Sequence, residues 1–235
     1  HSHALGTSDY DLDDLYSPDT SQWQSKVLHI GSPKYSPNKT YAFDRSRYNN
    51  HGTITGAVWK QLPSGIWVLT FDGSDDKITV PAVASLNFGG TTITIGGWVK
   101  VTALQTKPWL AQREGDTTLN NWQAYLIDDG RLFLSFWSAN VEKSSYSTSV
   151  GYAAGVFYHI VITYDGANVR FYANGILIGA PVAQTGTIDT DASVTNVGGN
   201  AIVGYLAGSF GEVRIYNRAL TALEIQNIYL ATESR

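Results

Sequence analysis

The sequence predicts an all-β protein, folded as an antiparallel sandwich or barrel, with one short helix at its C-terminal end. Segments in which apolar and polar residues alternate recur at short intervals along the 235-residue chain, as in strands with one buried face. Asp-Gly and Asn-Gly pairs separate several of these segments, and both pairs tolerate the positive φ angles of tight hairpin turns. Many short strands joined by glycine-containing turns are typical of sandwiches and barrels.

The expected strands follow one another in a regular series. Residues 66–71 and 77–80 flank the turn signal Asp72-Gly73. Residues 91–101 place isoleucines and valines on one face and Trp98 on the other. Three hairpins follow: residues 122–127 with 131–137 around Asp128-Asp129-Gly130, residues 156–164 with 168–173 around Asp165-Gly166, and the turn Asn174-Gly175 before residues 176–178.

One helix is expected, over about residues 222–230. The segment Thr221-Ala222-Leu223-Glu224 is a capping box, in which the Thr221 hydroxyl accepts from the Glu224 N–H and the Glu224 carboxylate accepts from the Thr221 N–H. Ile225, Ile228 and Tyr229 recur at helical spacing, so we expect this side of the helix to face the body of the domain.

The N-terminal segment differs from the rest of the chain. Residues 1–24 are polar and acidic without a clear period, and we expect them to form an arm or linker. Residues 25–235 contain no composition break, so we expect them to form one domain. The chain contains no Met, which predicts a processed mature protein or a piece of a longer one.

The composition excludes several classes of protein. Charged residues make up 15% of the chain, well below the roughly 25% of an average soluble domain, so a highly charged disordered chain is excluded. The net charge of -4 lacks the basic footprint of a nucleic-acid binder. The absence of cysteine excludes a disulfide scaffold and a cysteine nucleophile. Because no run of about 18 apolar residues occurs, we expect no membrane insertion.

Six segments, in the same order, resemble those of the laminin-G-like group of concanavalin A-like lectin/glucanase jelly rolls. They are residues 41–53 (YAFDRSRYNNHGT), 71–76 (FDGSDD), 93–100 (ITIGGWVK), 158–166 (YHIVITYDG), 171–175 (FYANG) and 211–220 (GEVRIYNRAL). The resemblance covers about residue 25 to the end. It implies an antiparallel jelly-roll β-sandwich over residues 25–235, in a group that mostly binds and rarely catalyses.

The residues do not form the carboxylate pair that a glycosidase needs. A glycosidase holds two carboxyl groups about 5–5.5 or 6.5–9.5 Å apart, whereas the five glutamates of this chain are far apart in the sequence. Asp72, Asp75 and Asp76 cluster in a turn, where aspartate usually bonds its own backbone. His159 lies among apolar residues and is expected to be a packed histidine. No Gly-x-Ser-x-Gly elbow or phosphate-binding loop is present.

The resemblance implies a structural Ca²⁺ between the loop of residues 44–52 and the closing strand. The ligands would be the carboxylates of Asp44 and Glu212 and the backbone oxygens of Asn49 and His51. The sequence departs from the family pattern at Gly211, where an acidic residue is expected, and lacks a glycine between Ser46 and Tyr48. The alternative is an Asx-turn held by Asp44 and Asn49.

Seven tryptophans offer flat faces on which sugar rings can stack. Trp67 and Trp98 lie in family-like strands and are expected in the core. The expected ligand-binding residues combine aromatic rings with amide and guanidinium groups for sugar hydroxyls, and they are Trp109, Arg113, Asn121, Trp122, Tyr125 and Trp137. Ordinary sandwich packing is the alternative for each of them.

Together these features predict a non-catalytic recognition module at a cell or particle surface, extracellular or on a virion. Its expected partner is a glycan or cell-surface polysaccharide. A structural or decoration protein of a virion or surface layer is the second hypothesis, in which the N-terminal arm contacts other subunits. A glycan-cleaving enzyme is the third.

Overall fold

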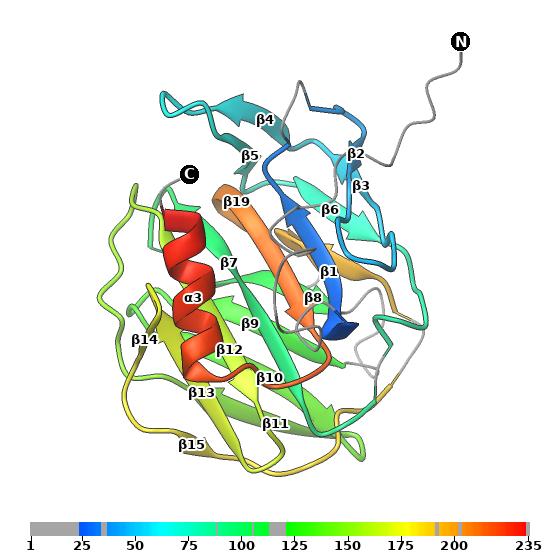
Figure 1. Ribbon diagram of the computed structural model, residues 1–235, viewed down its shortest axis with the longest axis vertical. Coiled ribbons are helices and arrows are strands. Elements are labelled where there is room, and N and C mark those ends of the chain that lie inside the picture. The colour runs from blue at the N-terminus through cyan, green and yellow to red at the C-terminus, as the bar shows by residue number, and fades with distance from the viewer. Residues whose placement is uncertain are drawn as a thin grey trace.

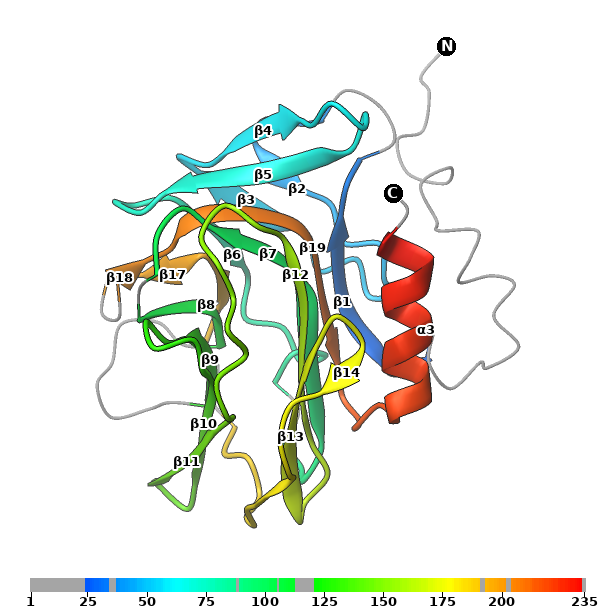
Figure 2. The same ribbon diagram turned by 90° about the vertical axis from the view of Figure 1, so that its left-hand side faces the viewer.

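The computed structural model describes residues 24–33, 37–87, 89–104, 106–112, 121–190, 193–201 and 204–233. Two β-sheets lie face to face, and the short C-terminal helix covers the outside of one of them (Figures 1 and 2). Hydrogen-bonded strand neighbours are antiparallel in both sheets. This is the jelly-roll-like sandwich that the sequence predicts, so the expected fold class is confirmed.

The nine-stranded sheet has the order β14-β13-β12-β7-β19-β5-β4, with β1 beside β19 and β15 beside β13. Its strands are β1 (Lys26–Gly31), β4 (Val58–Gln61), β5 (Trp67–Asp72), β7 (Ile93–Val101), β12 (Tyr158–Tyr164), β13 (Asn168–Ala173), β14 (Ile176–Leu177), β15 (Val182–Ala183) and β19 (Ala207–Tyr216). β19 pairs with β7, β5 and β1 along its length and so holds the centre of the sheet together.

The eight-stranded sheet has the order β11-β10-β9-β8-β16-β6-β3-β2. Its strands are β2 (Tyr41–Ala42), β3 (Gly52–Thr55), β6 (Lys77–Val80), β8 (Lys107–Gln112), β9 (Trp122–Leu126), β10 (Leu132–Ser138), β11 (Val141–Tyr146) and β16 (Thr195–Val197). A separate two-stranded ribbon joins β17 (Gly199–Asn200) to β18 (Gly204–Tyr205).

The main core lies between the sheets and is built by alternation along each strand. Ile95 of β7 and Ile162 of β12 face Leu134 and Phe136 of β10 in one buried cluster, whose members are nearly inaccessible to solvent. Gly97 lets β7 approach β19 closely, because a Cβ at this position would lie 2.0 Å from the Glu212 carbonyl oxygen. The register between these strands shifts just there, between Phe210 and Glu212.

Helix α3 (Ala222–Glu233) packs on the outer face of the nine-stranded sheet (Figure 2). The expected capping box is present, with the Thr221 N–H donating to Glu224 Oε2 at 2.7 Å and the Glu224 N–H donating to Thr221 Oγ1 at 3.3 Å. A second apolar cluster fills the contact between helix and sheet, and its members are Val161, Tyr172, Tyr216, Leu220, Ile225 and Ile228. The helix continues one turn beyond its expected end because Thr232 is also buried against the sheet.

Trp98 and Trp67 were both expected in the core, and neither is fully buried there. Trp98 does not lie in the core between the sheets, because it faces outward beneath α3 and donates its indole N–H to Thr232 Oγ1 at 2.8 Å. Trp67 is only half-buried. Within the described ranges, no helix is long and apolar enough to cross a membrane.

Candidate functional site

The outer face of the eight-stranded sheet carries a transverse row of side chains. We call this set the outer row, and its members are Tyr41, Thr53, Thr79, Asn196, Gln123, Ser135 and Ser144. They lie along one line of cross-strand partners, which crosses β8 at the backbone of Ala111. Their neighbours along the strands, such as Ile54, Ile78 and Leu134, belong to the core, so the row faces away from it. Hydroxyl and amide groups therefore dominate the row.

A row of aromatic side chains lies next to the outer row, two residues away from Gln123, Ser135 and Ser144 on β9, β10 and β11. We call it the aromatic ladder: Tyr125 pairs with Phe133, and Phe133 pairs with Tyr146. The ring centroids are 5.3 Å and 4.6 Å apart, within the range of stabilising ring contacts. Phe133 is buried and Tyr125 half-buried, whereas Tyr146 is 45% exposed. Arg131 lies over the Tyr146 ring at 4.7 Å, so the open edge of the ladder combines a ring with a guanidinium group.

Polar groups of the outer row lie directly beside the ladder. The Tyr125 hydroxyl donates to Gln123 Oε1 at 2.6 Å, which fixes the orientation of both side chains. Ser135 is fully buried, and its hydroxyl has no hydrogen-bond partner among the described residues. Ser144 is exposed at the edge strand β11. An aromatic surface next to hydroxyl and amide groups can stack a sugar ring and hydrogen-bond its hydroxyls.

Three of the six expected ligand-binding residues share this outer face. Tyr125 belongs to the ladder, and the Trp137 N–H donates to the Asn121 carbonyl at 3.0 Å on the neighbouring strand. Trp137 is half-buried and Asn121 is buried. The side chain of Trp109, in β8, and the whole of Arg113 lie outside the described residues.

Trp122 was expected at the surface, and this is wrong. Its side chain is 1% exposed and belongs to the core between the sheets. The reason is the two-residue period of β9, which places Trp122 on the opposite face from Asn121 and Gln123. Sequence reasoning missed Gln123, Phe133 and Tyr146. The register of the hairpin around residues 128–130 brings Phe133 beside Tyr125, the two-residue period of β9 places Gln123 on the same face, and Tyr146 joins them through the pairing of β10 with β11.

The carboxylate of Asp44 is already saturated by hydrogen bonds. Its Oδ1 accepts from the backbone N–H groups of His29 at 2.7 Å and Ser46 at 2.9 Å. Its Oδ2 accepts from the Ser46 hydroxyl at 2.6 Å and the Asn50 N–H at 2.7 Å. Asn49 has a φ of 53°, and the Nδ1 atom of His51 accepts from the Asp44 N–H at 3.0 Å. These contacts close the loop without a cation, in the manner of the expected Asx-turn.

Glu212 is likewise committed to protein partners. Its carboxylate accepts from Arg214 Nε at 2.6 Å and contacts His29 Nε2 at 3.2 Å. Burial alone raises the pKa of Glu212, but the charge of Arg214 and the contact with His29 hold that pKa well below its ordinary value. Two of the four expected ligands, the carboxylates of Asp44 and Glu212, are therefore bonded to protein groups, and the calcium site stays a prediction.

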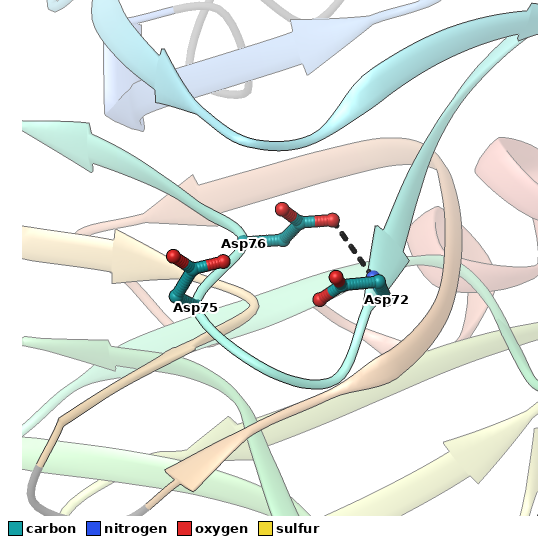
Figure 3. A group of neighbouring side chains, drawn as sticks. All are labelled: Asp72, Asp75 and Asp76. Atoms are coloured by element: carbon teal, nitrogen blue, oxygen red, sulfur yellow. Dashed lines mark hydrogen bonds between the residues drawn. The ribbon is translucent and has the colours of Figure 1, made fainter.

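Asp72, Asp75 and Asp76 are the one group of described residues whose potential ligand atoms lie close enough for a metal, within 4.8 Å of one another (Figure 3). Asp76 Oδ2 accepts from the Asp72 N–H at 2.8 Å, and Asp72 Oδ1 accepts from the Ser74 N–H at 2.7 Å. Asp76 is buried, and burial raises its pKa. The carboxylates of Asp72 and Asp76 thus close the turn between β5 and β6, as expected from the sequence.

A protein-family model matches most of the sequence. The model Laminin_G_3, described as the concanavalin A-like lectin/glucanases superfamily, matches residues 72–226, which is more than half of the chain. The chain therefore belongs to this family. No curated protein sequence matches it.

Solved structures with a similar fold include binding domains of clostridial toxins. The binding domain of Paraclostridial Mosquitocidal Protein 1 is 18% identical with a TM-score of 0.69, and the chain covers 52% of it. The receptor binding domain of botulinum neurotoxin D is 14% identical with a TM-score of 0.67 and 53% covered. Trypanosoma rangeli sialidase is 20% identical with a TM-score of 0.63 and 33% covered. Each match covers 89% of this chain, which spans about half or less of these structures, and shows the fold.

Proposed function

We propose that this protein is a non-catalytic carbohydrate-binding module that acts outside the cell. The observation that carries the proposal is the aromatic ladder of Tyr125, Phe133 and Tyr146, which ends in an exposed ring beside the hydroxyl and amide groups of the outer row. The ladder is rigid because each ring contacts the next and Tyr125 is hydrogen-bonded to Gln123. A ligand that stacks there therefore orders few side chains.

The chemistry of this face favours binding over hydrolysis. The outer row and the ladder contain hydroxyl, amide and aromatic groups. The carboxylate of Glu142 lies beside them on β11 and accepts from the Ser144 hydroxyl at 3.3 Å, whereas most glycosidases act through a pair of carboxyl groups. Similarity to structures entitled binding or receptor binding domains supports the same conclusion. The proposed partner is a glycan or cell-surface polysaccharide, which places the protein on the outside of a cell or particle.

Glycan-array binding of two variants and a matched control tests this proposal. Tyr146→Ala and Trp137→Ala remove rings from the outer face, and we expect about tenfold weaker binding, or ~1.4 kcal/mol, for each. Val141→Ala is the control, because Val141 is an exposed side chain of the same strand β11 on the opposite face. Its binding should equal that of the wild type.

The melting temperature separates binding from stability. Because Tyr146 is 45% exposed and contacts the Phe133 ring, Tyr146→Ala should lower the free energy of unfolding by only about 1 kcal/mol. Unchanged glycan binding by both ring variants, or release of reducing sugar by the wild type, contradicts the proposal.

A further inference from the structure

The turn between β9 and β10 carries an ion pair at the open end of the aromatic ladder. Arg131 Nε donates to Asp129 Oδ2 at 2.7 Å, and the Arg131 backbone N–H donates to Asp129 Oδ1 at 3.1 Å. The guanidinium carbon of Arg131 lies 4.7 Å from the centroid of the Tyr146 ring. A carboxylate, a guanidinium group and an aromatic ring are therefore joined by direct contacts. We call Asp129, Arg131 and Tyr146 the ladder-end site.

All three side chains of the ladder-end site are accessible. The side chains of Arg131 and Asp129 are 39% and 47% exposed, and Tyr146 is 45% exposed although Phe133 and Arg131 both contact its ring. Within the described part of the chain, the two Nη groups of Arg131 have no hydrogen-bond acceptor. A carboxylate offers about four lone-pair sites, and Asp129 uses two of them for Arg131. Unused donors and unused acceptors thus lie side by side.

Backbone hydrogen bonds hold Asp129 and Arg131 in place. The Gly130 N–H donates to the Ile127 carbonyl at 3.0 Å, and the Ile127 N–H donates to the Arg131 carbonyl at 2.9 Å. The neighbouring segment braces the turn, since the Val150 N–H donates to the Gly130 carbonyl at 2.7 Å. The ion pair therefore stands on a fixed turn, and a ligand that binds to it orders few protein groups.

The charges of this turn favour a neutral ligand over an anion. Residues 128–131 hold one guanidinium group and the two exposed carboxylates of Asp128 and Asp129. Glu142 adds a further exposed carboxylate on the same face of β11 as Tyr146. Negative charge therefore exceeds positive charge in residues 128–131, which opposes the approach of an acidic sugar. A sugar hydroxyl carries no charge and can either donate to a carboxylate or accept from a guanidinium group.

We propose that the ladder-end site binds a neutral sugar through two adjacent hydroxyl groups, a vicinal diol. One hydroxyl donates to the Asp129 carboxylate, its neighbour accepts from an Arg131 Nη group, and the apolar face of the sugar packs against the exposed part of the Tyr146 ring. Because the carboxylate and the guanidinium group are hydrogen-bonded to each other, hydroxyls on adjacent carbon atoms can reach both. The inference rests on the function proposed above and adds the groups that select the ligand.

Calorimetric titration with three kinds of probe tests the inference. The neutral probes are cellotriose, mannotriose and lactose, the capped probes are the per-O-methylated form of each, and the acidic probe is trigalacturonate. We expect at least one neutral sugar to bind at least tenfold more tightly than its capped form and than trigalacturonate. Its affinity should not change with salt, because the ligand carries no charge. Equal affinity for the capped form, tighter binding of trigalacturonate, or no binding of any neutral probe overturns the proposal.

Matched variants locate the diol at the ion pair. Asp129→Asn and Arg131→Gln should each weaken the neutral sugar at least tenfold and remove its preference over the capped form, which a purely structural role would leave unchanged. Arg170→Gln is the control, because Arg170 forms a similar pair with Asp165 at a hairpin of the other sheet. Its affinity should equal that of the wild type. An equal loss in the control, or wild-type affinity in both ladder-end variants, overturns the proposal.

The same variants separate this inference from the function on which it rests. If Tyr146→Ala weakens glycan binding while Asp129→Asn and Arg131→Gln do not, the ladder binds sugar without help from the ion pair, and only this inference fails. If none of the three variants changes binding on the glycan array, the function proposed above fails with it.

Discussion

Asp44 is the residue on which the loop between β2 and β3 depends. Its side chain is 4% exposed, and its two oxygens accept hydrogen bonds from three backbone N–H groups and one hydroxyl. A buried carboxylate that is bonded in this way stabilises the fold, because its removal leaves several donors without partners.

Asp44→Ala should lower the free energy of unfolding by about 3 kcal/mol, since three backbone N–H groups lose their acceptor. Chemical denaturation measures the change. Asp75→Ala is the control, because Asp75 is exposed, and its effect should stay within about 0.5 kcal/mol. A loss of similar size in both variants contradicts the role of Asp44.

Calcium should not shift the melting temperature. The oxygens of Asp44 and Glu212 already accept from protein donors, so a cation at this place would have to displace them. Thermal melting in excess Ca²⁺ and in excess chelator gives the comparison. A rise of several degrees with Ca²⁺ restores the calcium site that the family resemblance implies, and Asp44→Ala should then abolish that rise.

His159 makes stability depend on pH. Its ring lies beneath α3 between Trp98, at 5.4 Å, and Tyr229, at 6.0 Å. Burial lowers its pKa to about 4, with Glu212 and Arg214 as the charged groups that act on it. Burial also lowers the pKa of His29 to about 4. Both histidines are therefore neutral in the folded protein over a range in which they are protonated in the unfolded chain.

The unfolding free energy should consequently fall as the pH drops from about 7 to 5. The unfolded state binds protons near pH 6.5 and the folded state only near 4, so His159 alone costs about 2 kcal/mol over this interval. Denaturation at both pH values measures the loss. His159→Phe keeps an aromatic ring at this position and should reduce the loss, and an unchanged pH dependence contradicts the assignment.

At the scale of the element, the capping box determines where α3 begins. Burial by itself raises the pKa of Glu224, but hydrogen bonds from Arg218 and Thr221 lower it to about 2. Thr221→Ala should destabilise the protein by about 1 kcal/mol, since it removes one partner of the box. Thr221→Ser keeps the hydroxyl and should retain most of the stability in chemical denaturation. Equal loss in both variants argues against the cap.

The elements that the sequence predicts are those with a clean period or a strong turn. β12 ends at the Asp165-Gly166 turn, β13 ends at the Asn174-Gly175 turn, and β7 follows the Gly89-Gly90 pair. The observed bounds of these three strands lie within about two residues of expectation. β11 escaped prediction because its segment VEKSSY is largely polar on both faces, as suits an edge strand. β1 escaped because it buries Lys26 and His29, whose charges sequence patterns assign to the surface.

The candidate site was predictable only in part, because the sequence of a single strand does not show which of its two faces is buried. β9 carries Trp122 on one face and Tyr125 on the other, so aromatic content alone does not tell the two faces apart. Trp122 faces the core because its cross-strand partner on β10 is the core residue Phe136, and Leu134 pairs with Ala124 in the same way. These pairings are formed across the sheet and cannot be seen in the sequence of β9 alone. Tyr146 becomes a site residue only through its pairing with Phe133.

At the scale of the whole molecule, the outer face of the eight-stranded sheet is open to a ligand only in parts. The outer row crosses the sheet from strand to strand, exposed at Tyr41, Thr53 and Ser144 and buried at Asn196, Gln123 and Ser135. The exposed end of the aromatic ladder, Tyr146, lies on the edge strand β11. Seven strand spacings separate this edge from β2, or roughly 34 Å measured along the sheet. A ligand on the ladder therefore contacts the β11 edge, and only a long chain could contact β2 as well.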